Sequence, residues 1–339
     1  MGKVLITGGA GYFGTILAER VRAAGDEVVV LDLNAPAPAP GVTSIVADVR
    51  DADAVRAACE GVDVVLNNVA QVPLAKDRDL FWSVNVAGTA NVLAAARDAG
   101  VAKVVHTSSS AIFGIPERNP VDESTPPRPL EAYGRAKAEA EMLCRDAAAT
   151  GLDVTVVRPR TILGHGRLGI MAVLFELVEA GAPVFVMGSG ENRYQLVHAE
   201  DLADAVVLAS RRSGATTYNI GATEFGTMRE TLDALCEHAG TGSRVRSLPV
   251  APARWGMRLL STAGLAPFAP YHWLLYSESL WFDTTRARTE LGWVPRHSNA
   301  SMVIESYDWF IAHRDQLAGA SHHTSPVKLG AMALLKRLP

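Results

Sequence analysis

Short apolar runs alternate with amphipathic stretches along the first 160 residues of the chain. The apolar runs are rich in Val and Ile and are bounded by Gly, Asp or Pro, as expected for strands that are buried on both faces. The stretches between them carry apolar residues at spacings of three and four, which is typical of helices that cover a sheet. The pattern predicts strands at 3–8, 27–33, 42–48, 62–70, 102–110 and 153–159, and helices at 14–25, 51–61, 81–100 and 131–149.

The segment between the first predicted strand and the first predicted helix is rich in glycine. In "ITGGAGYFGTILAE", Gly8, Gly11 and Gly14 have the spacing G-x-x-G-x-x-G. Glycine at these positions allows a tight turn and a close approach of the backbone to a pyrophosphate, and the helix N-terminus adds free N–H groups. The pattern predicts a dinucleotide-binding site.

A carboxylate follows at the end of the second predicted strand. Asp32 lies 18 residues after Gly14. A carboxylate at this place can hold the ribose hydroxyls of NAD and repel the 2′-phosphate of NADP. We therefore predict NAD as the cofactor. Arg22 and Arg50 leave NADP as the alternative, because a neighbouring arginine can bind that phosphate.

Regular alternation of strands and helices predicts an α/β fold with a Rossmann-type, doubly wound parallel sheet. After about residue 160 the alternation weakens and Pro, Gly and aromatic residues become frequent, which predicts a smaller, irregular C-terminal substrate lobe. We expect the NAD-binding Rossmann domain at 1–160 with returns at about 193–221, the substrate-binding lobe at 161–192 and 222–315, and a C-terminal tail at 316–339.

Composition and charge narrow the class of protein. The chain has 339 residues, of which 48% are hydrophobic and 20% are charged, as in a globular protein with a large core. Its net charge of −4 gives no reason to expect nucleic acid. The three cysteines are isolated and lack metal or redox spacing. The strand pattern starts without a signal peptide and no apolar run reaches about 18 residues, so we expect a cytosolic protein with no transmembrane span.

Tyr133 and Lys137 stand out in the predicted helix at 131–149. A spacing of four places both side chains on one face of a helix. Lys137 is the only lysine between Lys103 and Lys328, a span that contains 19 arginines. Position 137 therefore favours an ammonium that a guanidinium cannot replace. The pair fits an acid–base tyrosine with a lysine beside it, and it also fits two ordinary residues on a solvated helix.

Several motifs together resemble the extended branch of the short-chain dehydrogenase/reductase superfamily, which includes the NAD-dependent epimerase/dehydratase family and the 3β-hydroxysteroid dehydrogenase-like enzymes. The resemblance extends from residue 3 to about residue 312. The motifs that carry it are "TGGAGYFG" at 7–14, "ADVRD" at 47–51, "NVAGT" at 85–89, "HTSSSAIFG" at 106–114, "YGRAK" at 133–137, "VRP" at 157–159, "VHAEDLADA" at 197–205 and "FDTTRARTELGWVP" at 282–295.

The resemblance implies roles for residues at matching positions. Tyr133 would be the catalytic acid and base, Lys137 would lower the pKa of its phenol and bind the nicotinamide ribose, and Ser109 would hydrogen-bond the reacting oxygen. Asp48 would contact adenine, and Asn85 would help to place the lysine. The implied cofactor contacts are Gly8, Gly11, Tyr12, Phe13, Gly14, Asp32, Asp48, Val49, Val69, Ala70, Asn85, Tyr133, Lys137 and Pro159.

Two departures from the family patterns bear on the reaction. Ser110 and Ala111 stand where the 4,6-dehydratases carry an Asp-Glu pair, so elimination of water from a sugar is not expected. Thr161 stands where many sugar epimerases carry an asparagine that holds the diphosphate, and this weakens the sugar-nucleotide interpretation.

The first hypothesis for the function is an NAD-dependent epimerase of a nucleotide-activated sugar, which abstracts a hydride and returns it to the opposite face. Arg193 stands where such enzymes place an arginine against the diphosphate, and Arg160 and Arg167 add candidate phosphate ligands. The expected substrate contacts are Ser109, Ser110, Arg160, Thr161 and Arg193.

Two alternatives stay open. One is an NAD-dependent dehydrogenase or reductase of a hydrophobic, sterol-like or lipid-like secondary alcohol or ketone. Its substrate would lie against an aromatic segment that is equally compatible with a lobe core, namely Trp273, Leu274, Leu275, Tyr276 and Trp281. The minor alternative is a cofactor-binding regulator without turnover.

The remaining features carry weaker hypotheses. His198 is interpreted as structural, and the adjacent His322 and His323 have no other ligand near them in sequence, so no metal site is predicted. The apolar, weakly basic tail at 325–339 predicts an amphipathic helix that packs on the body or touches a membrane surface. In relatives, helices matching 81–99 and 131–149 form a dimer interface, so the resemblance implies a homodimer.

Overall fold

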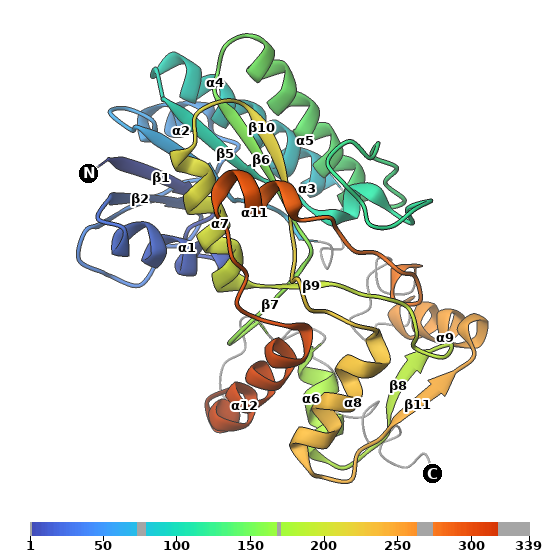
Figure 1. The fold of residues 1–339 in the computed structure, drawn as a ribbon. Helices are drawn as coiled ribbons and strands as arrows, with labels where there is room; N and C mark the ends of the chain where they lie inside the picture. The colour runs from blue at the N-terminus through green and yellow to red at the C-terminus, as the bar shows by residue number, and fades with distance from the viewer. Residues whose placement is uncertain (1, 73–78, 168–170, 263–273, 318–339) are drawn as a thin grey trace. The chain divides into compact units, whose positions relative to one another are not determined.

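The computed structural model describes residues 2–72, 79–167, 171–262 and 274–317 (Figure 1). The chain forms two compact units. Unit 1 comprises Met1–Thr161, Ala199–Gly221 and Phe282–Pro295, and unit 2 comprises Ile162–His198, Ala222–Trp281 and the chain from Arg296 onward. Unit 1 is therefore assembled from three separate stretches of sequence.

A seven-stranded parallel sheet forms the centre of unit 1. Its strands run in the order β10-β6-β5-β4-β1-β2-β3. The order reverses direction between β1 and β4, and ligands of open α/β sheets bind at the carboxyl ends of the strands next to such a reversal. The strands are β1 Lys3–Thr7, β2 Glu27–Asp32, β3 Val42–Val46, β4 Val64–Asn67, β5 Lys103–Thr107, β6 Val154–Pro159 and β10 Thr216–Ile220.

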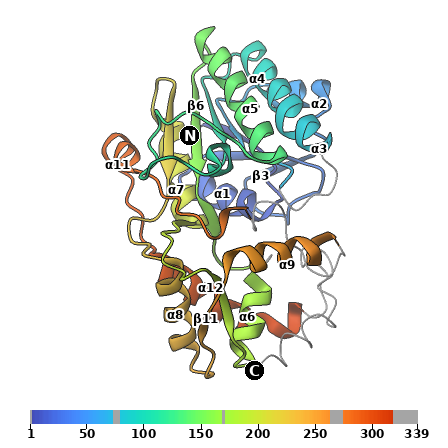
Figure 2. The same cartoon turned by 90° about the vertical axis from the view of Figure 1, so that its right-hand side faces the viewer.

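Helices cover both faces of this sheet, which confirms the predicted α/β fold. Helices α2, α4 and α5 lie together on one face, and α1, α7 and α11 lie on the other (Figures 1 and 2). Apolar side chains from the strands and the first group of helices form a buried cluster that includes Leu5, Val65 and Val104. The helices are α1 Tyr12–Ala23, α2 Ala52–Ala58, α3 Asp79–Trp82, α4 Gly88–Asp98, α5 Ala132–Ala149, α7 Ala199–Arg211 and α11 Thr285–Leu291.

Local sequence signals predicted the ends of most of these helices and strands to within a few residues. Asp51 caps α2 as expected, since its side chain accepts the N–H groups of Asp53 and Ala54. The helix predicted at 81–100 is instead α3, a π-helical turn at Ser83–Ala87 and α4. Periodicity does not reveal this break, because the apolar spacing continues through it.

The predicted return to the main sheet at about 193–221 is only partly correct. Within that range β10 alone enters the sheet, and α7 begins at Ala199. The segment Phe282–Pro295, which we had placed in the substrate lobe, belongs to unit 1. Two hydrogen bonds join this segment to α7 and β10: Nε1 of Trp293 donates to the carbonyl of Asp201, and the hydroxyl of Tyr218 donates to Glu290.

Unit 2 has its own core, in which Phe175, Leu235, Tyr307 and Phe310 are buried. Strands β8 (Val184–Met187) and β11 (Val245–Leu248) form a parallel pair. The chain enters the unit in β7 (Thr161–Leu163), which pairs with β9 (Leu196–His198). The helices are α6 Met171–Glu179, α8 Met228–Ala239, α9 Val250–Thr262 and α12 Asn299–Leu317. None of the helices in the described ranges is long and apolar enough to cross a bilayer.

Candidate active site

The predicted cofactor and catalytic residues of unit 1 gather at one edge of its sheet. Gly8 follows β1, Asp32 ends β2, Val69 follows β4, Ser109 follows β5 and Pro159 ends β6. All these strands are parallel, so their carboxyl ends lie on the same side. The sheet itself therefore brings together residues that are up to about 150 positions apart in the sequence.

The loop between β1 and α1 has no space for a side chain at Gly8 or at Gly14. Gly8 has a φ of +71°, and a Cβ on it would lie 2.8 Å from Cα of Val69. A Cβ on Gly14 would lie 2.1 Å from the carbonyl oxygen of Gly8. Gly11 caps α1 without a side-chain hydrogen bond, so the first N–H groups of the helix face an open end. This loop fits a pyrophosphate. Tyr12 and Phe13 form the first turn of α1, where Phe13 is buried.

Asp32 is held in a defined orientation. Its Oδ2 accepts the backbone N–H of Ala10 at 3.1 Å, and its Oδ1 accepts that of Asn34 at 3.0 Å. Because Ala10 belongs to the glycine loop, the carboxylate lies beside the place where the pyrophosphate would be bound. This arrangement fits the ribose hydroxyls of a dinucleotide.

Arg22 and Arg50, the two arginines that could accommodate the 2′-phosphate of NADP, each donate hydrogen bonds to protein oxygens. Arg22 donates to the carbonyl of Pro40 at 3.0 Å. Arg50 donates from Nε to both carboxylate oxygens of Asp48, at 3.0 and 2.9 Å, and this hydrogen bonding lowers the pKa of Asp48. Asp48, which we expect to contact the adenine, is thus paired with Arg50. Both guanidinium groups are thus engaged with protein oxygens, which agrees with NAD.

A buried polar network supports the chain after β4, and no sequence motif had indicated it. Oγ1 of Thr7 donates to Oδ1 of Asn67 at 2.9 Å and accepts the backbone N–H of Val69 at 3.3 Å. Nδ2 of Asn67 lies 3.0 Å from Nδ1 of His106. Burial first, and then the charge of Lys137, hold the pKa of His106 well below its usual value, so this ring is neutral and can accept from Asn67.

Asn85 holds the next residues of the same loop. Its Oδ1 accepts the N–H of Gln71 at 2.7 Å, and its Nδ2 donates to the carbonyl of Gln71 at 3.1 Å. Asn85 therefore fixes the backbone beside Val69 and Ala70, and its expected role in placing the lysine stays a prediction. Val49 is buried against Gly88, so only its backbone could contact a cofactor.

Tyr133 and Lys137 occupy the first two turns of α5, and both are buried. Glu131 caps the helix, since its carboxylate accepts the N–H groups of Tyr133 at 2.7 Å and Gly134 at 2.6 Å. Lys137 donates from Nζ to the carbonyl of Thr107, at the end of β5, at 2.8 Å. The hypothesis of an exposed helix face is therefore wrong, because the ammonium of Lys137 is held against the carboxyl edge of the sheet.

Burial lowers the pKa of Lys137 from 10.5 to about 8, although the negative charge of Glu141 opposes the shift. Unfolding exposes the amine and restores the higher pKa. Between about pH 8 and 10.5 the unfolded state binds more protons than the folded state, so the contribution of Lys137 to stability rises with pH across this window. Below the window both states are protonated and the burial penalty is present in full.

We expect this pH dependence to disappear in Lys137→Met. The measurement is the free energy of unfolding by urea at closely spaced pH values, for the wild type and the variant. Subtracting the two curves removes the contributions of other groups, including Lys103, whose pKa is also lowered by burial. A difference that stays flat from pH 8 to 10.5 would contradict the buried ammonium.

One of the three consecutive serines is placed to reach a ligand. Ser108 and Ser110 are 3% and 2% exposed, whereas Ser109 is only half-buried. Oγ of Ser109 accepts the N–H of Ala111 at 3.2 Å, as the cap of the 3₁₀ helix Ser110–Phe113. A hydroxyl that accepts in this way keeps its own proton to donate to a reacting oxygen. The geometry favours Ser109 over its neighbours, and it argues against Ser110 as a substrate contact.

A buried ion pair joins α5 to β6 and was not predicted. Arg158 donates from Nε and Nη2 to Glu141, at 3.0 and 2.6 Å, and both side chains are about 95% buried. The guanidinium also lies 5.3 Å from the ring centre of Phe113, in the serine loop. Arg158 thus connects the helix that carries Tyr133 with the loop that carries Ser109. The "VRP" motif was the only signal for it.

The arginines expected at the substrate lie in different surroundings. Arg160 is 1% exposed and its guanidinium lies 5.7 Å from the ring centre of Phe282. Its burial favours a structural role over a phosphate contact. Thr161, at the start of β7, is half-buried. In unit 2, Arg193 is exposed, and its guanidinium lies 4.8 and 4.7 Å from the ring centres of Phe225 and Trp281, which also contact each other.

The aromatic segment proposed for an apolar substrate is divided among several roles. Trp281 lies against Arg193, Tyr276 contacts the ring of Tyr194, and Leu275 is buried. Leu274 is half-buried. Trp273 and the tail beyond residue 317, with His322 and His323, lie outside the described residues.

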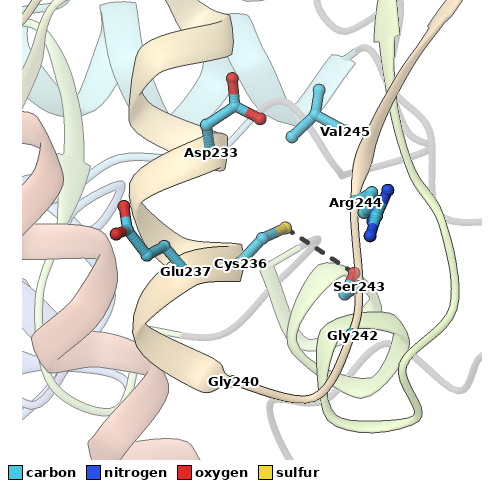
Figure 3. A pocket seen from close by; sticks show the side chains of 8 residues that line it. All are labelled: Asp233, Cys236, Glu237, Gly240, Gly242, Ser243, Arg244 and Val245. Carbon is cyan, nitrogen blue, oxygen red and sulfur yellow. Dashed lines mark hydrogen bonds between the residues drawn. The ribbon is translucent and has the colours of Figure 1, made fainter.

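A separate pocket in unit 2 contains none of the predicted site residues (Figure 3). It lies between α8 and β11, where Sγ of Cys236 is 3.7 Å from Oγ of Ser243. Burial raises the pKa of the Cys236 thiol, so this cysteine is a poor nucleophile. The residues of Figure 3 thus lack the constellation of a catalytic site.

Residues 4–221 match the sequence model of the NAD dependent epimerase/dehydratase family. The chain belongs to this family. An uncharacterized Sinorhizobium fredii protein, y4nG, is 49% identical over 98% of this chain and 85% of its own length. A UDP-glucose 4-epimerase of Streptomyces lividans is 30% identical over 92% of this chain and 97% of its own length. The structure of a Thermus thermophilus UDP-glucose 4-epimerase in complex with NAD is similar with a TM-score of 0.73, at 29% identity, over 91% of this chain and 99% of that one.

Membership of the epimerase/dehydratase family confirms several expectations. The protein is an NAD-dependent enzyme of the short-chain dehydrogenase/reductase type, an epimerase or an oxidoreductase. Its cofactor is NAD, which the glycine loop and Asp32 fit. The roles of individual residues at the site stay predictions, because family membership does not test them.

Proposed function

We propose that the protein is an epimerase that inverts a carbinol centre of a nucleotide-activated sugar. The observation that carries the proposal is the arrangement around Arg193. Its guanidinium lies 4.8 and 4.7 Å from the ring centres of Phe225 and Trp281 while the residue stays exposed. These aromatic contacts restrict the side chain and leave it accessible, and a guanidinium fork binds the oxygens of a diphosphate well.

The residues of unit 1 supply the chemistry. The glycine loop and Asp32 would hold the pyrophosphate and ribose of NAD, and Lys137 would bind the second ribose. When bound, NAD would supply reversible hydride transfer at the carbinol carbon, and hydride delivery to the opposite face of the ketone would invert the centre. The substrate is thus inverted with no net redox change.

Tyr133 would move the proton in this cycle. Its phenolate takes the proton of the sugar hydroxyl as the hydride leaves, and its phenol gives the proton back when the hydride returns. A phenol has a pKa of about 10 in water, so it needs a nearby positive charge to act as a base at neutral pH. Lys137, one helical turn away, would supply that charge when protonated. Ser109 would donate a hydrogen bond to the same sugar oxygen.

The serine loop supports epimerisation over dehydration. Elimination of water needs an acid and a base beside the reacting carbon, and Ser110 and Ala111 provide neither. Both side chains are also buried. Thr161 in place of an asparagine leaves the diphosphate with Arg193 as its main candidate ligand.

We also propose that α4 and α5 form a homodimer interface. Two large apolar side chains are exposed in this region, Met142 on α5 and Trp82 in the preceding α3, with 58% and 38% of their surface accessible. Apolar groups of this kind are enriched in interfaces. The cytosolic location that we expected from the sequence stays a prediction.

The first experiment uses the untreated, purified protein. The protein is denatured, and released NAD and nucleotide-sugars are quantified by mass spectrometry. It is then incubated with UDP-glucose, UDP-N-acetylglucosamine and UDP-glucuronate, and the C4 epimers are sought by proton NMR. We expect NAD close to one equivalent and at least one epimer. Protein that exchanges NAD freely, ignores every nucleotide-sugar and oxidises hydrophobic alcohols would instead support the dehydrogenase hypothesis.

A further inference from the structure

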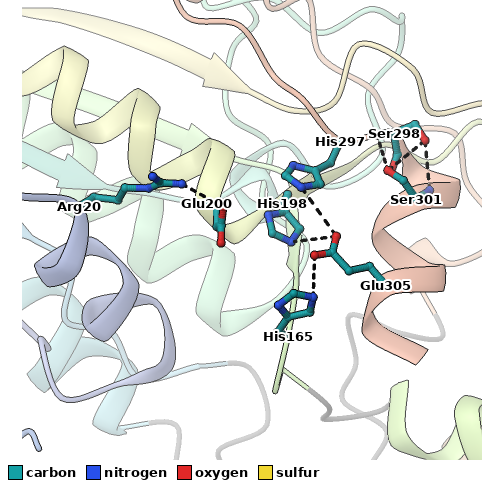
Figure 4. A network of polar contacts seen from close by, with 8 residues as sticks. All are labelled: Arg20, His165, His198, Glu200, His297, Ser298, Ser301 and Glu305. Carbon is teal, nitrogen blue, oxygen red and sulfur yellow. Dashed lines mark hydrogen bonds and ion pairs between the residues drawn. The ribbon is translucent and has the colours of Figure 1, made fainter. Parts of the chain in front are cut away.

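Four segments of unit 2 bring three imidazoles around one carboxylate (Figure 4). Glu305 lies in the second turn of α12. His165 follows β7, His198 ends β9, and His297 lies just before α12. In all three histidines it is Nε2 that faces Glu305, at 2.6 Å from Oε1 for His165, and at 3.9 and 3.7 Å from Oε2 for His198 and His297.

We propose that His198, His297 and Glu305 are the ligands of a binding site for a divalent transition cation, with Zn²⁺ as its representative, and that His165 orients Glu305 through its contact with Oε1. Imidazole nitrogens together with one carboxylate are a common ligand set for this class of ion. The proposal concerns a site that no motif of the family predicts, and it does not depend on the reaction proposed above.

The distances allow one ion to be shared. The ligand atoms of His198, His297 and Glu305 all lie within 4.8 Å of one another. Two ligand atoms that each lie about 2.1 Å from a tetrahedral ion are roughly 3.4 Å apart. The pairs at 3.7 and 3.9 Å are close to this separation and too long for hydrogen bonds. A small inward movement would bring all three ligand atoms onto one ion.

The arrangement of the rings favours the same conclusion. His198 and His297 are stacked, with ring centres 3.8 Å apart and planes inclined by 22°. His165 meets His198 edge to face, at 6.2 Å. Two imidazoles in contact and a carboxylate facing both of them place together the ligand types that such a cation prefers.

An ion can reach the site from solvent. The side chains of His165 and Glu305 are 45% and 35% exposed, whereas that of His198 is 2% exposed. His165 and Glu305 also line a pocket that continues along α12 to Trp309 and His313. The buried imidazole thus forms the floor of the site, and the exposed side chains form its entrance.

Bound metal would connect the segments that carry the ligands. The first and last of these ligand residues, His198 and Glu305, are separated by 107 residues in sequence. An ion that binds the folded state and not the unfolded one raises the apparent stability of the protein. The expected role is therefore structural, and it resides within unit 2.

The test begins with full-length protein without a histidine tag, treated with EDTA and then dialysed. Zn²⁺ is titrated in competition with a chromophoric chelator. We expect one equivalent of Zn²⁺ to bind and the melting temperature to rise. Glu305→Gln and His297→Asn should each weaken the binding by at least about tenfold.

Two control variants test the specificity of binding. His238, on α8, lies 2.8 Å from Asp308, which is on α12 like Glu305. This contact involves one histidine and one carboxylate. His238→Gln should keep the affinity for Zn²⁺. The double variant His322→Ala/His323→Ala should also keep it, which separates the proposed site from the two adjacent histidines near the end of the chain.

A second measurement needs only the wild-type protein. Histidines are modified with diethylpyrocarbonate with and without one equivalent of Zn²⁺, and the products are mapped by mass spectrometry. Zn²⁺ should protect His297, while His238, whose side chain is 40% exposed, reacts equally in both samples. The proposal fails if the wild type binds no stoichiometric Zn²⁺, if Glu305→Gln binds it as tightly, or if His297 is not protected.

Discussion

Tyr133→Phe is expected to lower kcat by about 10²–10⁴-fold, the usual range for the loss of a general acid–base group. Phenylalanine has the same ring but no ionisable hydroxyl. The ring of Tyr133 packs edge to face on Phe81, with centres 6.0 Å apart, and the variant keeps this contact. The substitution therefore removes the proton-transfer group and leaves the helix intact.

The measurement is the rate of epimer formation from whichever nucleotide-sugar the wild type accepts, together with NAD binding by calorimetry. NAD affinity should change little, because Lys137 and the glycine loop are untouched. Tyr218→Phe is a matched control in unit 1, since it removes a tyrosine hydroxyl that donates to Glu290 at 2.9 Å. The control should turn over like the wild type. Full activity in Tyr133→Phe would show that another group moves the proton.

Arg158→Met is expected to destabilise the protein by about 3–5 kcal/mol, because it leaves Glu141 buried without its cation. Glu141 and Arg158 have side chains that are 4% and 5% exposed. Methionine keeps much of the apolar length of arginine, so the loss comes mainly from the unpaired carboxylate. A protein loses stability when one partner of a buried ion pair is removed, even where the intact pair contributes little to the free energy of unfolding.

The measurement is the midpoint of urea unfolding for each variant. Arg56→Met is the matched control, because Arg56 pairs with Asp53 at 2.7 Å but the two side chains are 56% and 87% exposed. Surface pairs contribute about 0–1 kcal/mol, so the control should unfold close to the wild type. The double variant Arg158→Met/Glu141→Leu should recover part of the loss. Equal unfolding midpoints for Arg158→Met and Arg56→Met would contradict the prediction, because they would mean that leaving Glu141 buried without its cation does not destabilise the protein.

Local sequence signals predicted the parts of the site that depend on backbone geometry. Gly8 and Gly14 stand where any side chain would collide with the neighbouring backbone, so the requirement for glycine is visible in the sequence itself. Asp32 ends a strand whose apolar run is evident in the sequence. Ser109 was implied by the family resemblance, and in the structure it is the most exposed of the three consecutive serines.

Other residues could not be found from the sequence, because their partners come from distant segments. Thr7, Asn67 and His106 meet because three strands end at the same edge of the sheet. Phe225 and Trp281 both lie against the guanidinium of Arg193, although each is more than 30 residues away from it in sequence. Composition shows that such residues exist, but neither spacing nor periodicity shows which of them are neighbours.

His198 is the clearest example of a residue whose neighbours could not be predicted from the sequence. In sequence it is a single histidine before a helix, and a structural role was the simplest hypothesis. In the structure it stacks on His297 and faces Glu305, which are about 100 residues further along the chain.

The sequence by itself determined the α/β fold and the position of the glycine loop, and it predicted NAD as the cofactor and Tyr133 and Lys137 as a pair on one helix face. Each of these depends on residues within one or two adjacent elements, where spacing and periodicity follow directly from backbone geometry. Only the tertiary structure decided that Lys137 is buried, that Arg158 and Glu141 form an internal ion pair, and that three histidines surround Glu305. These features depend on contacts between segments far apart in the chain, and their energies arise from burial, which only the folded protein defines.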